Sequence, residues 1–427
     1  MKYSEMSKLE LQNTKQEVLS AYNKFKARGL SLDMSRGKPS QEQIMAAIGI
    51  LDTLNSKTGH ISESKINCLN YGNMDGLPEC KQLFAEILDV PAEKIFVAGN
   101  SSLNLMFDYI LQCYALGAAE NAKPWKEQGP VKFICPVPGY DRHFGIAEYL
   151  GIDMITVPMT DTGPDMNEVE RLAKDSLVKG IFCVPKFSNP TGVTYSDEIV
   201  KRLAKMEAAE DFRIIWDNAY CVHHLKGKDD KLIDILEECE KAGNPSRAII
   251  FSSSSKISFS GAGVAVFAAN KENYEFLKKR YVKQTIGFDK ANQLRHVRYF
   301  KDINGVNKHM DILADIVTPK FEVVISNFEK ELSHLGIANW TNPNGGYFIS
   351  LNVLPGTAKR VYELCKEAGV TLTNCGATYP YGKDPKDENI RIAPTFPSIE
   401  ELADATGLLI ISTKLAAIEK YLEKMED

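Results

Sequence analysis

The chain has 427 residues, of which 44% are hydrophobic and 25% charged, and its formal net charge is −5. This length suits two or three domains, and without a basic surplus neither nucleic acid nor an anionic membrane is expected as a partner. The nine cysteines are never spaced as Cys-x-x-Cys, the N-terminus lacks an apolar signal segment, and residues 248–269 are interrupted by Lys256. We therefore expect a cytoplasmic protein with no disulfide framework, metal site or membrane span.

The chain begins with a polar arm, residues 5–28, which is predicted to be helical, and continues with LSLDMSRGKPS, which is predicted to be extended. From about residue 75, helices and short apolar strands alternate. Helical periodicity marks 77–88, 102–117, 166–175, 196–210 and 272–283. Strands are predicted at 131–138, 153–159, 179–185, 212–218, 247–253 and 263–269. Because these strands are apolar on both faces, we predict an α/β domain whose mostly parallel, seven-stranded type of sheet lies between helices.

After about residue 305 the pattern changes to long helices with few strands. Helices are predicted at 308–333, 357–368 and 398–425, with strands in GGYFISLNV and IRIAP. This composition indicates a smaller α+β domain. We predict an arm and segment, 1–50, that pack with the small domain, a large domain over 51–310 and the small domain over 311–427. The two domains are expected to share a cleft.

Polar side chains follow several of the predicted strands at the point where each strand ends. Asn100, Ser101 and Ser102 follow IFVAG and precede a helix, and Lys186 and Asn189 follow 179–185. Asp217 lies just after the apolar part of 212–218, and Lys256 follows 247–253. Open parallel sheets bind ligands beyond the carboxyl ends of their strands. The sequence therefore predicts a cofactor site at one edge of the sheet.

Lys256 lies among small serines after an apolar strand, where poor solvation would lower the pKa of its amine and leave it nucleophilic toward an aldehyde. Considered without its neighbours, Lys256 could also be a surface lysine on a polar turn. Asp217 would supply the anion that a pyridine nitrogen needs, although a carboxylate in this place can also cap a helix. Asn189 and Tyr220 could reach the 3′ oxygen of such a ring, while Asn-Pro-Thr-Gly can also be a simple turn.

Eight motifs appear in an order that resembles the fold-type I pyridoxal-phosphate enzymes, and specifically the class I aminotransferase superfamily. They are YGNMDGLPECKQLF (71–84), GNSS (99–102), PGY (138–140), NPTG (189–192), DNAY (217–220), SSSSK (252–256), PNGGYF (343–348) and NIRIAP (389–394). The resemblance covers nearly the whole chain. Within the superfamily, SSSKISFSGAGVAVF and DKANQLRHVRYF are most similar to the branch described as type Ic aspartate aminotransferases.

By this resemblance, Lys256 would hold pyridoxal 5′-phosphate and carry a proton at the substrate Cα, and Asp217 would pair with the pyridine nitrogen. Arg391 would hold the substrate α-carboxylate by a two-pronged contact that lysine cannot make, with Gly37 beside it. Tyr140 would stack on the cofactor ring, and Asn189 and Tyr220 would contact its 3′ oxygen. The phosphate would be bound by Asn100, Ser101, Ser102, Ser253 and, from a second subunit, Tyr71. Tyr140 could instead be a core aromatic residue, and Arg391 a surface ion pair.

The chain departs from many relatives at the position seven residues after Lys256, where an arginine that binds the phosphate is expected and Gly263 stands instead. Serine hydroxyls, backbone N–H groups or Arg295 and Arg298 would have to replace it. A dicarboxylic substrate also needs a cation for its side chain. The candidates are Arg36, Lys186 and Arg295, the last supplied by a partner subunit.

The resemblance implies a homodimer with shared sites that transfers the amino group between aspartate and 2-oxoglutarate. Three alternatives stay open: an aromatic or broad amino-acid transaminase, a carbon–sulfur lyase or decarboxylase on the same fold, and a regulatory module that binds the cofactor. The arm before residue 30 is too short for a DNA-binding domain, which disfavours the regulatory module.

Overall fold

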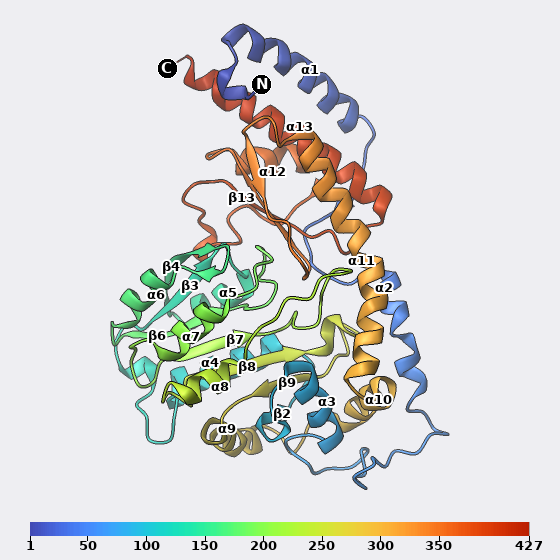
Figure 1. Ribbon diagram of the computed structural model, residues 1–427, viewed down its shortest axis with the longest axis vertical. Helices are drawn as coiled ribbons and strands as arrows, with labels where there is room; N and C mark the ends of the chain where they lie inside the picture. Colours follow the sequence, from blue (N-terminus) through green and yellow to red (C-terminus); the bar gives the residue numbers. More distant parts are fainter. Residues whose placement is uncertain (427) are drawn as a thin grey trace.

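The computed structural model describes residues 1–426 and shows a sheet domain below a second, mostly helical body (Figure 1). The sheet has eight strands in the order β2-β9-β8-β7-β6-β3-β4-β5. Their bounds are β2 Ile95–Val97, β3 Lys132–Val137, β4 Asp153–Thr160, β5 Gly163–Pro164, β6 Val178–Cys183, β7 Arg213–Asp217, β8 Ala248–Ser253 and β9 Ala265–Ala268. From β8 to β4 all neighbouring pairs are parallel, and only β9 and the two-residue β5 run against their neighbours.

Every residue of β2, β6, β7, β8 and β9 is buried, which explains why these strands are apolar on both faces. Helices cover both faces of the sheet (Figure 1), and the sheet separates two hydrophobic clusters, one on each face. The helices of this domain are α3 Pro78–Leu88, α4 Ser102–Leu116, α5 Asp141–Tyr149, α6 Met166–Ala173, α7 Asp197–Lys205, α8 Ile235–Lys241, α9 Lys271–Gln284 and α10 Lys290–Phe300.

The second body is built on three long helices and a small antiparallel sheet in the order β10-β11-β13. Its elements are α11 Ile303–Glu331, α12 Ala358–Glu367, α13 Ile399–Lys424, β10 Ala338–Trp340, β11 Ile349–Val353, β12 Val370–Thr371 and β13 Asn389–Ile392. The N-terminal helix α1 (Lys8–Lys26) lies along α13, and β1 (Leu32–Asp33) pairs in parallel with β12 (Figure 1). Tyr3, Leu11, Tyr22 and Met34 are consequently buried in the same core as the C-terminal helices.

The long helix α11 joins the two bodies. Its first half contributes Val306 and Met310 to a core of the sheet domain, and its second half contributes Phe321 and Phe328 to the core of the upper body. A short helix, α2 (Gln41–Ala46), runs beside α11 and carries the chain from β1 into the sheet domain (Figure 1). The predicted domain boundaries at residues 50 and 310 remain predictions.

The predicted fold class is confirmed, with seven strands of three or more residues and β5 as a short addition. Four helices were not predicted: α2, α5, α8 and α10. Both α5 and α8 have fewer than ten residues, and α5 contains Gly145, so neither has a long periodic pattern. Among residues 1–426, no helix is long and apolar enough to cross a membrane.

Candidate active site

The sheet brings five strand ends to one edge. β3, β6, β7 and β8 run in parallel, and β2 runs the same way because it is antiparallel to β9, which is antiparallel to β8. The segments that follow these strands carry Tyr140, Asn189, Asp217, Lys256 and Ser101. The predicted cluster of polar strand ends is therefore present at a single edge.

Lys256 ends a 3-10 turn, Ser254–Lys256, which directly follows β8. Its ammonium nitrogen lies 4.9 Å from the centre of the Tyr220 ring and 5.9 Å from that of Tyr347. Burial lowers the pKa of the Lys256 amine, and the nearby Asp217 carboxylate opposes this shift. Within residues 1–426 the amine has no hydrogen-bond partner that would hold its proton. These surroundings favour the neutral, nucleophilic form of the amine.

Asp217 is 4% exposed and occupies the last position of β7. Its Oδ2 lies 3.0 Å from Nε2 of His143, a residue of α5 that is 1% exposed and stacks on Phe182 at 4.9 Å. His143 was missed by the sequence analysis, although it follows Tyr140 by three residues and one helical turn brings both to the same edge. The pair fixes the orientation of the carboxylate.

The other carboxylate oxygen, Oδ1 of Asp217, is buried and has no hydrogen-bond partner among the described residues. A buried, unpaired carboxylate oxygen costs free energy unless a cation or a donor meets it. A protonated pyridine nitrogen is such a donor. The amine of Lys256, which has no hydrogen-bond partner among residues 1–426, can react with an aldehyde. These two features fit pyridoxal phosphate. The residues that would hold it are Lys256, Asp217, Tyr140, Asn189, Tyr220 and the serines at the start of α4.

The start of α4 offers a place for a phosphate. Ser101 is the residue before the first turn, and its hydroxyl does not cap the helix, so the first N–H groups of this 15-residue helix stay free. Serine hydroxyls from the end of β8 reach the same place, since Ser253 Oγ lies 3.0 Å from Ser255 Oγ and the latter 3.3 Å from the carbonyl oxygen of Asn100. Hydroxyls and amides thus converge where the phosphate is predicted.

The backbone around Gly263 leaves little room for a side chain. A Cβ atom there would lie 3.0 Å from the backbone nitrogen of Ser255, closer than ordinary packing allows. Arg298 is held elsewhere, with Nη1 donating to the Thr53 carbonyl at 3.0 Å. Arg295 is half-buried on the same helix, and its Nε has no partner within residues 1–426. Among residues 1–426, neither arginine donates a hydrogen bond to the serines around α4.

Arg391 lies on β13, 7% exposed, and crosses from the upper body to the sheet edge. Its Nη1 donates to Asp141 Oδ1 at 2.7 Å and to Asn189 Oδ1 at 3.3 Å. The guanidinium lies over the Phe348 ring at 4.9 Å, and Gly37 packs so closely on Phe348 that a Cβ atom would meet the ring at 2.3 Å. The structure therefore brings Arg391, Asn189 and the predicted Gly37 segment together.

The two tyrosines of the predicted site lie near Asp217 and Lys256. Tyr140 precedes α5 with its ring centre 5.0 Å from that of His143, and Tyr220 is 5% exposed beneath the Lys256 amine. Burial raises the pKa of both phenols, so each stays a neutral hydrogen-bond donor. Their predicted roles toward the cofactor ring stay predictions.

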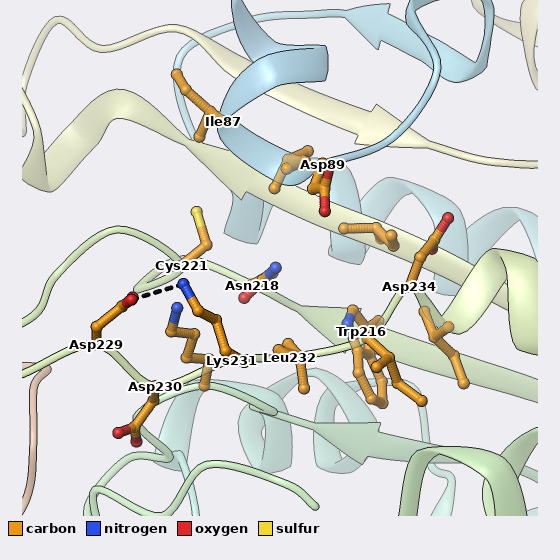
Figure 2. Close-up of a pocket in the computed structure, with 15 residues that line it drawn as sticks. Ile87, Asp89, Trp216, Asn218, Cys221, Asp229, Asp230, Lys231, Leu232 and Asp234 are labelled. Carbon is orange, nitrogen blue, oxygen red and sulfur yellow. Dashed lines mark hydrogen bonds and ion pairs between the residues drawn. The ribbon is translucent and has the colours of Figure 1, made fainter. Parts of the chain in front are cut away.

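Lys186 does not join Arg391. It lines a cavity of about 160 Å³ beside Asn218, Cys221 and the Asp229–Lys231 ion pair of 2.6 Å (Figure 2). Its amine lies 3.3 Å from Nε2 of His224, and burial lowers its pKa. Arg36 and Tyr71 are exposed, the latter by 79%, and among residues 1–426 neither side chain forms a hydrogen bond or an ion pair with the residues around Lys256.

The fold is that of the fold-type I aminotransferases, which is the class that the sequence predicts. The family model described as aspartate amino-transferase matches residues 6–425, and the chain belongs to this family. An aspartate aminotransferase of Corynebacterium glutamicum is 44% identical over 429 residues, which are 98% of this chain and 99% of the relative.

The structural comparisons agree. A solved aspartate transaminase of Corynebacterium glutamicum has a TM-score of 0.96 at 44% identity, with 99% of both chains covered. The α-aminoadipate aminotransferase LysN of Thermus thermophilus, complexed with N-(5′-phosphopyridoxyl)-L-leucine, shares the fold at a TM-score of 0.71 and 20% identity, over 93% of this chain and 95% of LysN. The predicted family and the predicted aminotransferase activity are thereby confirmed.

Proposed function

We propose that the protein holds pyridoxal 5′-phosphate on Lys256 and transfers amino groups between L-aspartate and 2-oxoglutarate by a ping-pong mechanism. The single observation that carries the cofactor assignment is the unpaired Oδ1 of buried Asp217, next to the unpaired amine of Lys256. The relative named as an aspartate aminotransferase, at 44% identity over the whole chain, supports the choice of substrate.

When bound, pyridoxal phosphate supplies an electron sink for the charge that develops at the substrate Cα. Asp217 would hold a proton on the pyridine nitrogen, because its carboxylate is buried and His143 fixes its orientation. Lys256, with its pKa lowered by burial, would take the proton from Cα and return it during the transfer. Arg391 would orient the substrate through its carboxylate, and the aromatic walls Tyr220 and Tyr347 would keep water from the amine.

The experiment separates the two half-reactions. L-Aspartate alone should yield oxaloacetate in an amount equal to the enzyme, and later addition of 2-oxoglutarate alone should yield the same amount of glutamate. Release of pyruvate, ammonia and hydrogen sulfide from L-cysteine would instead show a carbon–sulfur lyase, and release of carbon dioxide and alanine from L-aspartate would show a decarboxylase. Faster turnover with phenylalanine than with aspartate would replace the dicarboxylic assignment with an aromatic one.

The attachment of the cofactor has its own test. Borohydride reduction of the holoenzyme should fix a pyridoxyl group on Lys256, as found by peptide mass spectrometry. The variant Lys256→Ala should bind no reducible cofactor and should lose both half-reactions, because it lacks the nucleophile and the proton carrier. A pyridoxyl group on another lysine would overturn the assignment of Lys256.

We further propose a homodimer in which each chain completes the site of the other. Tyr71, Leu69 and Ile286 are 79%, 65% and 65% exposed, although their side chains are largely apolar. Lys290 binds the carbonyl oxygens of Asn70 and Gly72 at 2.7 and 2.8 Å, so this exposed segment is anchored to α10. An anchored segment with exposed apolar side chains is typical of an interface.

A location in the cytoplasm also remains a prediction.

A further inference from the structure

Asp141 forms an ion pair with Arg391, the arginine that would bind the substrate α-carboxylate in the proposed function. The 2.7 Å contact between Arg391 Nη1 and Asp141 Oδ1 is the only ion pair that Arg391 makes among residues 1–426. The remaining contacts of the guanidinium are to neutral oxygens, Asn189 Oδ1 at 3.3 Å and Thr373 Oγ1 at 3.4 Å. A carboxylate is therefore already present where a substrate carboxylate would arrive.

A substrate carboxylate that binds with both oxygens needs two neighbouring nitrogens of the guanidinium. Nη2 has no hydrogen-bond partner among the described residues, whereas Nη1 is shared between Asp141 and Asn189. The edge formed by Nη1 and Nη2 therefore becomes fully available when Asp141 leaves. Nε, on the other edge, donates to Thr373, whose hydroxyl is fixed by its own bond of 2.8 Å to the carbonyl of Ser35.

Asp141 is the partner that can move away. Its side chain is 32% exposed, while that of Arg391 is only 8% exposed and is stacked on Phe348. Asp141 is also the first residue of the nine-residue helix α5, and the free N–H groups at a helix start stabilise a carboxylate. When Asp141 separates from Arg391, its carboxylate is therefore still stabilised by water and by the N–H groups at the start of α5, so the separation costs little free energy.

We propose that Asp141 is a resident carboxylate that competes with the substrate α-carboxylate for Arg391 and thereby raises KM for every amino acid alike. The inference rests on the proposed role of Arg391. Because all amino-acid substrates share the α-carboxylate, the competition weakens binding of aspartate and alanine by the same factor. The competition therefore determines the affinity for amino acids but not the preference of the enzyme for one substrate side chain over another.

The test compares Asp141→Asn with Glu148→Gln in the holoenzyme. Glu148 is exposed on the same helix, so its variant removes the same charge far from the guanidinium contact. Asp141→Asn should lower KM for L-aspartate and for L-alanine by one common factor of about three to ten, the range expected from an ion pair with one partly exposed partner. The Glu148→Gln variant should leave both values unchanged. If Asp141→Asn folds poorly, Asp141→Ser tests the same loss of charge.

Two further variants separate this inference from the proposed function. Arg391→Gln should raise KM for both amino acids strongly, and adding Asp141→Asn to it should change nothing more, because the competitor has lost its target. If Arg391→Gln leaves KM unaltered, the assignment of Arg391 fails and the inference fails with it. If Arg391→Gln behaves as expected but Asp141→Asn raises KM, leaves it unchanged or affects aspartate alone, only the role of Asp141 is overturned.

Discussion

At the scale of single residues, the site depends on one buried carboxylate and the histidine that orients it. The variant Asp217→Asn should keep the fold but lose the anion opposite the pyridine nitrogen, so turnover should fall on the order of 100–1,000-fold, the size typical of one lost preorganised charge. His143→Gln should cause a smaller loss, since it removes orientation and not charge. Single-turnover rates with aspartate check both. Exposed Asp161 offers the control, Asp161→Asn, and near-normal rates for Asp217→Asn would remove Asp217 from the site.

Residue chemistry alone predicted part of this site. Lys256, Asp217 and Asn189 follow buried strands, and the rule that parallel strand ends gather at one edge predicts that they meet. Asp141 and His143 could not be assigned in the same way, because they stand inside a helix that the sequence does not reveal. The contact of Arg391 with Asp141 joins positions 250 residues apart in the sequence, and only the packing of the two bodies creates it.

At the scale of elements, neutral His296 links α10 by a hydrogen bond to the segment that follows Lys256. His296 Nδ1 donates to the carbonyl of Asn292 at 2.8 Å, so Nε2 accepts from the Ser258 hydroxyl at 2.8 Å, two residues after Lys256. Burial lowers the pKa of His296 from 6.5 to about 4. Protonation would remove the acceptor that Ser258 uses, and the two elements would lose this contact.

This shift predicts how stability depends on pH. Between pH 6.5 and about 4, the unfolded chain binds a proton at His296 that the folded chain refuses, so the free energy of unfolding falls as the pH falls. The loss for this one group is at most about 1.4 kcal/mol per pH unit. Tm of His296→Gln should therefore decline less steeply than wild type between pH 6.5 and 4.5. The exposed His334→Gln variant should follow wild type, and an equal decline for all three proteins would contradict the prediction.

The elements themselves were predictable where they are long or buried on both faces. β6 and β8 are fully buried and were predicted to within two residues of their bounds, and the long helix α13 was predicted at 398–425. By contrast, α11 begins at Ile303, five residues before its predicted start, because Asp302 caps it after a break at Lys301 with φ of 68°. That break depends on local backbone geometry, which apolar periodicity does not report.

At the scale of the whole molecule, we expect two chains to assemble through the exposed segment around Tyr71. Leu69→Asp combined with Ile286→Asp should place charges in the interface and give monomers by light scattering, with most of the activity lost. Tyr71→Phe should leave the dimer intact and weaken only cofactor binding, because it removes one hydroxyl. Exposed Leu116 lies on α4, away from this segment, and Leu116→Asp is the matched control. A fully active monomer would contradict the shared site.

The proposed assembly would also bear on which cation binds the side-chain carboxylate of the substrate. Of the three predicted candidates, Lys186 faces the cavity with Asp229 and Lys231, so its loss should affect aspartate and alanine alike (Figure 2). Arg36 is exposed in the segment whose next residue, Gly37, packs on Phe348 beneath Arg391, which brings its backbone to the cleft. Arg295 lies on α10, the helix that anchors the exposed segment around Tyr71, from which it would act across the interface.

We therefore expect Arg36→Gln or Arg295→Gln to lower kcat/KM for aspartate far more than for alanine. An unpaired substrate carboxylate loses about 2–5 kcal/mol of transition-state binding, which corresponds to roughly 30- to 4,000-fold. Alanine has no such carboxylate and should lose little. Lys186→Gln serves as the comparison, since it removes a cation that does not contact Arg391. If Arg36 and Arg295 variants both keep the wild-type ratio while Lys186→Gln alters it, the cavity beside Asn218 must open to the substrate. If all three keep the ratio, the dicarboxylic assignment is wrong, and a transaminase of broader or aromatic preference takes its place.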